Sequence, residues 1–335
     1  MWTAAIVVAA AGAAGGHGAA AGEAASSVIT GTRMAVMPTS FRTPHYRALV
    51  SLHPSEVPPR TPSRVPVLLR SCHLESALAV TAFVTALAVA GGRGASGAVL
   101  VFVTVLAGQL SVGWCNDAAD AGRDTVCGRP DKPVATGELP SRTVAVAAGA
   151  ALALCVPLSL LNGAAAGAAH LVGVAAGWAY NLRFKRTVLS PLPYAVGFGS
   201  LPAFVTLGPP SQAWPAWWAV TAGALLGVGA HVINVLPDIE DDLATGVRGL
   251  PQRLGRAACR WSAPFVMPAA VGVVVVGPPG AVTVSGWILA AAAGCVAVLG
   301  TALPSAAGSR WPFRAALVVA GTAVTQLLLR GADMA

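Results

Sequence analysis

The chain has 335 residues, of which 55% are hydrophobic and only 10% are charged. Its mean hydropathy of +0.69 excludes an ordinary soluble domain, which cannot expose that much apolar surface. The formal net charge of +8 does not indicate a nucleic-acid binder, because the Lys and Arg residues are spread over several short segments. The composition instead predicts a polytopic membrane protein whose main partner is the lipid bilayer.

The first part of the chain differs from the rest. Residues 1–70 are predicted to be a flexible N-terminal lead-in, because they are rich in Ala, Gly, Pro, Ser and Arg and contain no run long enough to cross a bilayer. Met34 and Met37 are alternative translation starts within it. Residues 71–335 are predicted to form one membrane domain.

Nine apolar stretches follow one another in this domain. Each has roughly the ~20 residues that a helix needs to cross ~30 Å of hydrocarbon, and Gly or Pro clusters separate them. The sequence therefore predicts an all-α membrane protein with nine spans, at about 74–91, 95–115, 141–161, 163–181, 190–208, 214–234, 258–277, 281–301 and 312–329. The many Ala and Gly residues predict closely packed helices around a compact bundle.

The charges predict which side of the membrane each loop faces. With the N-terminus in the cytoplasm, 19 of the 21 Lys and Arg residues lie on the cytoplasmic side, and only Arg93 and Arg330 lie outside. This distribution agrees with the positive-inside rule. Of the 13 Asp and Glu residues, five lie in 116–142 and four in 235–260, both of them cytoplasmic loops that follow an even-numbered span. The two acidic clusters are expected to share one cytoplasmic site.

The spacing of the acids indicates how they are presented. At ~100° per residue, a helix that continues past Trp114 places its polar groups on one face about 100° wide, namely Asn116, Asp117, Asp120 and Asp124. NVLPDIEDD is expected to do the same, although Pro237 is expected to kink the helix, with Asn234, Asp238, Asp241 and Asp242. Such carboxylate faces suit Mg²⁺ together with a substrate diphosphate. A calcium loop is disfavoured because D-x-D-x-D-G is absent, and a transporter would place its acids within the spans.

Four motifs carry a resemblance to a known family. NDAADAGRD, residues 116–124, resembles NDxxDxxxD of the UbiA superfamily of intramembrane prenyltransferases, and DIEDD, residues 238–242, resembles its DxxxD motif. KPVATG, residues 132–137, resembles RPxxxG with Lys in the place of Arg, and YNLRFKR, residues 180–186, resembles a tyrosine-then-lysine loop. The resemblance covers roughly residues 65–330. It implies a nine-helix UbiA-type bundle with a central cavity and an active site at the cytoplasmic face.

The resemblance also implies a reaction and a set of site residues. It implies Mg²⁺-dependent transfer of a prenyl group from an isoprenyl diphosphate to a small, often aromatic, acceptor. The implied catalytic residues are Asp120, Asp124, Asp238, Asp242 and Tyr180, the last of which would face the reacting end of the donor. The implied metal site consists of Asn116, Asp117, Asp120, Asp124, Asp238, Asp241 and Asp242. The implied substrate contacts are Arg123, Lys132 and Lys185 for the diphosphate, Asn234, and Arg70 for a carboxylated acceptor.

An alternative reaction and the identity of the substrates stay open at this point. A membrane terpene cyclase of the same fold needs the same metal motifs but no acceptor. The acceptor itself, whether a quinone precursor or a specialised metabolite, and the length of the donor cannot be read from these motifs. The Ala/Gly/Val/Arg-rich composition suggests a bacterial genome, and the expected location is therefore the bacterial inner membrane.

Overall fold

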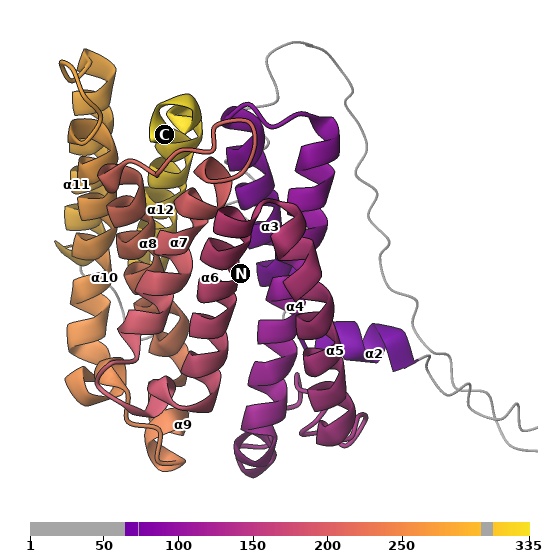
Figure 1. Cartoon of the computed structure of the whole chain (residues 1–335). Helices are drawn as coiled ribbons and strands as arrows, with labels where there is room; N and C mark the ends of the chain where they lie inside the picture. The colour runs from indigo at the N-terminus through magenta and orange to yellow at the C-terminus, as the bar shows by residue number, and fades with distance from the viewer. Residues whose placement is uncertain (1–63, 73, 303–310) are drawn as a thin grey trace, which may run out of the picture.

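The structure is a computed structural model that describes residues 64–72, 74–302 and 311–335 (Figure 1). The predicted lead-in over residues 1–63 lies outside the described residues. Residues 64–70, which the sequence analysis assigned to the lead-in, form helix α2 (Arg64–Arg70). All regular elements of the described part are helices, as the composition predicts.

Each apolar stretch identified in the sequence contains one long helix of the structure. The predicted boundaries agree with the observed ones to within a few residues, except that α4 extends further at its C-terminal end and α10 begins earlier at its N-terminal end. These helices are α3 (Leu74–Ala90), α4 (Ala95–Val126), α5 (Ser141–Leu161), α6 (Ala164–Leu182), α7 (Pro191–Thr206), α8 (Trp217–Val235), α10 (Leu250–Val276), α11 (Val284–Ala302) and α12 (Trp311–Leu329).

Fewer of these helices qualify as membrane spans on length and composition alone. Three do so within the described part of the chain, namely Ala95–Val126, Ser141–Leu161 and the stretch Trp217–Ala244. A fourth qualifies if Leu250–Ser262 and Phe265–Val276, which are bent by 54° at their junction, are counted as one span. Three further apolar helices of the described part, Leu74–Ala90, Val284–Leu299 and Val318–Leu329, are too short to qualify. The structure therefore supports a multi-pass helical bundle, and the nine spans stay a prediction.

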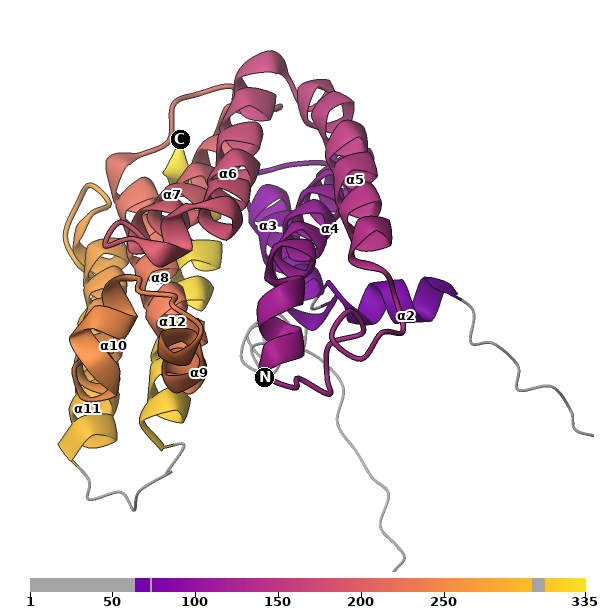
Figure 2. The same cartoon turned by 90° about the horizontal axis from the view of Figure 1, so that it is seen from below.

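The helices lie around a cavity lined by residues of α3, α4, α6, α7 and α8, and Figure 2 shows α6 between the side formed by α3, α4 and α5 and the side formed by α7 and α8. Around the cavity, α3 packs against α4, α4 against α6, α6 against α7, α7 against α8, and α8 against α12, which returns to α3. Helix α5 covers α4 and α6 from outside, and α10 and α11 cover the side of α12. The indole of Trp114 donates a hydrogen bond to the Leu68 carbonyl oxygen at 2.8 Å, which fixes α2 beside α4.

Glycines permit the closest helix contacts. A Cβ atom on Gly227 of α8 would collide with the Tyr194 carbonyl oxygen of α7, and one on Gly223 would lie 2.7 Å from the Phe198 carbonyl oxygen. Such backbone proximity is typical of membrane helices that pack through small residues. The predicted close packing is therefore present at the α7–α8 contact, which forms one wall of the cavity.

Two local features bring the acidic segments together. Helix α4 continues to Val126, so the whole first aspartate cluster lies on one helix. Helix α8 ends at Val235, and Pro237 lies in the short 3-10 helix η2 (Leu236–Asp238) that precedes α9 (Ile239–Ala244). The kink expected at Pro237 is therefore present. Figure 1 shows α9 and the C-terminal end of α4 at the same end of the bundle.

Candidate active site

A cavity of about 410 Å³ opens between α3, α4, α6, α7 and α8. Charged side chains from both acidic clusters line one part of it, and apolar side chains such as Val80, Val174 and Leu201 line the remainder. Most of the predicted site residues line the cavity: Asn116, Asp120, Arg123, Asp124, Lys132, Tyr180, Lys185, Asn234, Asp238 and Asp242. Residues more than 100 positions apart in the sequence therefore form one chamber that is charged at one end and apolar at the other.

Arg123 connects the two acidic clusters. Its guanidinium donates to Asp242 Oδ1 at 2.7 Å, to Asp120 Oδ2 at 3.0 Å and, more weakly, to Asp124 Oδ1 at 3.4 Å. Gln252 donates to the other Asp242 oxygen at 2.7 Å. A single cation thus occupies the space between three carboxylates, which would otherwise repel one another.

Two further cations pair with acids of the charged end. Lys185, from the 3-10 helix η1 (Phe184–Arg186), donates to Asp120 Oδ1, and both side chains are buried. Arg129 donates to Asp238 Oδ1 at 3.2 Å and also pairs with Asp131. The carboxylates and the cations of the charged end are therefore paired with one another, and the resulting network joins α4, the loop that follows it, η1, η2 and α9.

The loop cations differ in how firmly they keep their charge. Burial lowers the pKa of the Lys185 ammonium, and the neighbouring Asp120 carboxylate opposes that shift. The hydrogen bond between Arg129 and Asp131 raises the pKa of the guanidinium and lowers the pKa of the carboxyl group. The Asp131 carboxylate therefore favours the charged form of Arg129, whereas burial disfavours the charged form of Lys185.

The structure does not bring three of the predicted site residues to the cavity. Asp117 is buried beside the cavity wall, and its Oδ1 accepts a hydrogen bond at 2.6 Å from Lys132, which lines the cavity. Asp241 is exposed on α9, because the 3-10 turn at Pro237 changes the angular phase that an uninterrupted helix would have given it. Arg70 is exposed on α2 and pairs with Glu138 at 2.5 Å. Of the three, Asp117 contacts a cavity residue, Lys132.

The described residues contain no group of three or more His, Cys, Asp or Glu side chains that is assembled to hold a metal ion. The donor chemistry nevertheless fits Mg²⁺, because carboxylate and amide oxygens from two helices line one end of the cavity. Arg123 stands between three of these carboxylates, so the site needs a cation at that point. A metal ion bound there would have to displace the guanidinium.

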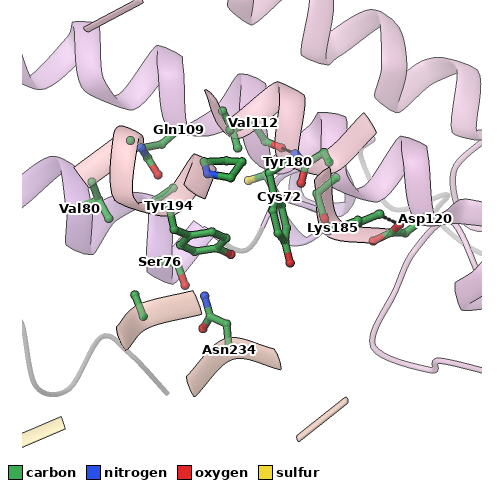
Figure 3. A pocket seen from close by; sticks show the side chains of 18 of the residues that line it. Cys72, Ser76, Val80, Gln109, Val112, Asp120, Tyr180, Lys185, Tyr194 and Asn234 are labelled. Carbon is green, nitrogen blue, oxygen red and sulfur yellow. Dashed lines mark hydrogen bonds and ion pairs between the residues drawn. The ribbon is translucent and has the colours of Figure 1, made fainter. Parts of the chain in front are cut away.

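Aromatic rings line the cavity next to the charged end. Tyr180 of α6 and Tyr194 of α7 meet edge to face, with ring centroids 4.9 Å apart. His231 of α8 packs against Tyr194 at 4.8 Å, and its Nε2 lies 3.0 Å from Ser190 Oγ. Figure 3 shows Tyr180 and Tyr194 between the Asp120–Lys185 pair and the opposite end of the cavity. The two tyrosine rings therefore separate the charged end of the cavity from the remainder.

Several residues of the site were missed by the sequence analysis. Arg129 and Gln252 could have been found, since Arg129 lies in the first acidic segment, 116–142, and Gln252 lies in the second, 235–260. Tyr194, His231 and Ser190 have no local signal, because each is an ordinary residue of an apolar helix or its end until the fold brings α6, α7 and α8 together.

Comparisons with known proteins agree with this geometry. The model of the UbiA prenyltransferase family matches residues 77–329. A curated relative, the bacteriochlorophyll synthase 33 kDa chain of Cereibacter sphaeroides, is 33% identical over 165 residues. The match covers 45% of this chain and 53% of that relative, so the chain spans about half of the relative's length.

Solved structures share the fold. A UbiA homologue from Archaeoglobus fulgidus bound to GPP and Mg²⁺ has a TM-score of 0.58 at 16% identity, and covers 78% of this chain and 99% of its own. A digeranylgeranylglyceryl phosphate synthase has a TM-score of 0.61 at 16% identity, covering 81% and 99%. An apo UbiA homologue from Aeropyrum pernix K1 has a TM-score of 0.55 at 20% identity, covering 76% and 97%. At these identities the likeness concerns the fold alone.

Proposed function

Because the chain belongs to the UbiA prenyltransferase family, we propose that it transfers a prenyl group from an isoprenyl diphosphate to a small aromatic acceptor in a Mg²⁺-dependent reaction. The observation that supports this most is the meeting of two aspartate clusters and four cations at one end of an apolar cavity. A diphosphate fits the charged end and an isoprenoid chain fits the apolar remainder. The GPP and Mg²⁺ bound by the Archaeoglobus fulgidus homologue are in keeping with this reading.

The proposed metal ligands are the carboxylates and the amide that line the cavity, namely Asn116, Asp120, Asp124, Asp238 and Asp242. When bound, Mg²⁺ would neutralise charge that develops on the diphosphate as the allylic C–O bond breaks. Asp117 and Asp241, which do not line the cavity, are proposed to support the site from outside rather than to ligate the metal.

The cations are proposed to change partners when the donor binds. Arg123, Arg129 and Lys185 now neutralise carboxylates, and the same groups reach the part of the cavity that a diphosphate would occupy. Their transfer to phosphate oxygens would place positive charge on the leaving group, which is the usual electrostatic contribution to such reactions. Lys132 is held beside them by Asp117.

The apolar part of the cavity has a separate task. Ionisation leaves an allylic carbocation, which water would quench unproductively. The faces of Tyr180 and Tyr194 stabilise positive charge through their π-systems, and apolar walls exclude water from the reacting carbon. A ring carbon of the electron-rich acceptor then forms a C–C bond to the carbocation and loses its proton to the released diphosphate, which restores the aromatic ring. Asn234, at the end of α8, lines the same region and is proposed to orient a substrate there.

The chain is a multi-pass membrane protein, and its orientation is part of the proposal. We assign the N-terminus and the charged end of the cavity to the cytoplasmic side of a bacterial inner membrane, with nine crossing helices. The distribution of Lys and Arg supports this orientation, since 19 of 21 fall on the proposed cytoplasmic side. A water-soluble diphosphate would then reach the charged end while its chain enters the apolar cavity.

The test uses the full chain in lipid nanodiscs with Mg²⁺, isoprenyl diphosphates of several lengths and a panel of aromatic acceptors, followed by mass spectrometry. Prenylated acceptor is the expected product. A cyclic hydrocarbon or alcohol formed without any acceptor would instead identify a terpene cyclase and overturn the transferase assignment. Arg70→Ala should leave the activity with uncharged acceptors intact. A selective loss of activity with carboxylated acceptors would indicate that Arg70 binds their carboxylate.

A further inference from the structure

The end of the cavity away from the carboxylates is not purely apolar. Gln109 of α4 and His170 of α6 both line the cavity. Figure 3 shows Gln109 at the opposite side from the Asp120–Lys185 pair, with the two labelled tyrosines between them. A Cβ atom on Gly108, the neighbour of Gln109, would lie 3.2 Å from His170 Nε2, so the two polar residues are at the same depth. We call Gln109 and His170 the distal polar pair.

The hydrogen bonds of His170 define which nitrogen carries the proton. Ser159 Oγ lies 2.7 Å from the Cys155 carbonyl oxygen, which can only accept, so the single hydroxyl proton is used there. His170 Nδ1 lies 2.8 Å from the same Oγ and must therefore donate to it. No carboxylate of the described residues bonds to this ring, so the imidazole is neutral. Its Nε2 is left with an available lone pair.

The ring is also held in place. His170 is only 3% exposed, and it stacks against Phe204 with ring centroids 4.8 Å apart. Ser159 on one side and Gly108 on the other complete its surroundings. Because the ring cannot turn without losing the Ser159 hydrogen bond, Nε2 is a fixed acceptor in the cavity wall.

Neither member of the distal polar pair has its full complement of partners. Among residues 64–72, 74–302 and 311–335, no hydrogen bond is made by His170 Nε2 or by the Gln109 amide. A hydrocarbon chain laid against these atoms would desolvate them without compensation, which is unfavourable. A ligand that offers both a donor and an acceptor at this depth would satisfy them.

We propose that the distal polar pair is a binding site for a hydroxyl group of the ligand, whose O–H donates to His170 Nε2 and whose oxygen accepts from the Gln109 amide. A hydroxyl group is the smallest group with both functions, and no ion pair is available here for a charged group. The inference rests on the proposed function, because it assumes that the cavity holds an isoprenoid diphosphate and its acceptor.

The depth of the pair indicates where that hydroxyl lies in the ligand. His170 precedes Tyr180 by ten positions on α6, which corresponds to about 15 Å along the helix. The hydroxyl therefore belongs to the far end of an elongated molecule whose reacting end lies near Tyr180. Two molecules meet that description, an isoprenoid donor hydroxylated at its tail and an extended acceptor with a hydroxyl group remote from the reacting carbon.

The experiment compares two matched pairs of probes on the full chain in nanodiscs with Mg²⁺. One pair consists of non-hydrolysable isoprenyl thiolodiphosphates of equal length with and without a terminal hydroxyl. The other consists of alkyl phenols with and without a terminal hydroxyl on the alkyl chain. Calorimetry is expected to show about tenfold tighter binding of the hydroxylated member in one pair, and that pair identifies the source of the hydroxyl.

Variants then test whether His170 and Gln109 cause the tighter binding of the hydroxylated probe, which we call the hydroxyl advantage. His170→Phe and Gln109→Leu should each remove most of the hydroxyl advantage, whereas His170→Gln, which restores an acceptor near Nε2, should retain part of it. Gln326→Leu on α12 is the matched control, because Gln326 does not line the cavity, and it should leave the advantage unchanged. Binding of inorganic diphosphate with Mg²⁺ should be the same in all of them.

The outcomes separate the two proposals. If neither hydroxylated probe binds more tightly than its partner to the wild-type chain, the distal site is refuted, whether or not the variants fold. The same conclusion follows if the advantage survives in both His170→Phe and Gln109→Leu. If inorganic diphosphate with Mg²⁺ fails to bind the wild-type chain, the proposed function fails instead.

Discussion

Replacement of Arg123 by Gln tests two roles of this residue separately. One role is to pair with the carboxylates of the ligand-free site, and the other is to bind the diphosphate of the donor. In the ligand-free structure the guanidinium is bonded to carboxylates of both aspartate clusters. Those carboxylate oxygens are the ones proposed to receive Mg²⁺, so the guanidinium and the metal compete. Arg123→Gln should therefore strengthen the binding of a divalent cation offered alone, even though it impairs the reaction.

The magnitude follows from the contacts that the metal must break. Arg123 makes two close hydrogen bonds to carboxylates, at 2.7 and 3.0 Å, and its side chain is 24% exposed. A hydrogen bond to a charged group contributes about 1.5–3 kcal/mol, and partial exposure favours the lower end. Removal of this competition should lower the dissociation constant of the cation alone by about 10- to 100-fold. The diphosphate complex should weaken at the same time, because its cationic partner is gone.

The assay is titration of Mn²⁺ into the full chain in nanodiscs, followed by electron paramagnetic resonance and repeated with inorganic diphosphate present. Arg256→Gln is the matched control, because it removes one equal charge from an exposed pair with Glu240 that does not line the cavity. The control should leave both affinities unchanged. Unchanged or weaker Mn²⁺ binding by Arg123→Gln would refute the competition between guanidinium and metal.

Three further predictions concern packing and the aromatic wall. Lys132→Met should destabilise the protein by about 3–5 kcal/mol by leaving buried Asp117 unpaired, and Asp117→Asn in the same chain should restore part of the loss in a thermal unfolding assay in detergent. Gly227→Ala should lower the unfolding temperature through collision with α7, whereas Gly149→Ala, which faces open space, should not; equal effects would contradict the close packing. Tyr194→Leu should lower kcat by about 2- to 30-fold with little change in KM. Tyr194→Phe should retain most of the rate, because the ring and not the hydroxyl stabilises the carbocation. Equal losses of kcat in both variants would argue against that role.

The sequence predicted those parts of the fold that depend on local composition. Long apolar runs bounded by Gly and Pro predicted the helices, and the period of α4 predicted that Asp120 and Asp124 share a face. Pro237 predicted the interruption after α8. These features are determined within one or two turns of helix, so no tertiary information was needed to find them.

Other features depended on contacts between distant segments. The exposed position of Asp241 on α9 could not be predicted from the spacing, because a short 3-10 turn precedes it and rotates the residues that follow. The bond between Arg123 and Asp242 joins residues 119 positions apart, and the His170–Ser159 bond forms between two different helices. Spacing in one segment cannot reveal such pairs, since they are fixed by how the helices pack.

The most direct test of the account measures diphosphate release from an isoprenyl diphosphate by the purified chain in nanodiscs, with and without Mg²⁺. The account predicts Mg²⁺-dependent release that falls by about 10²- to 10³-fold in Asp120→Asn and is unchanged in Asp333→Asn, an exposed aspartate paired with Arg330. Release by Asp120→Asn as fast as by the wild-type chain, or no Mg²⁺-dependent release from any donor, would contradict the proposed site.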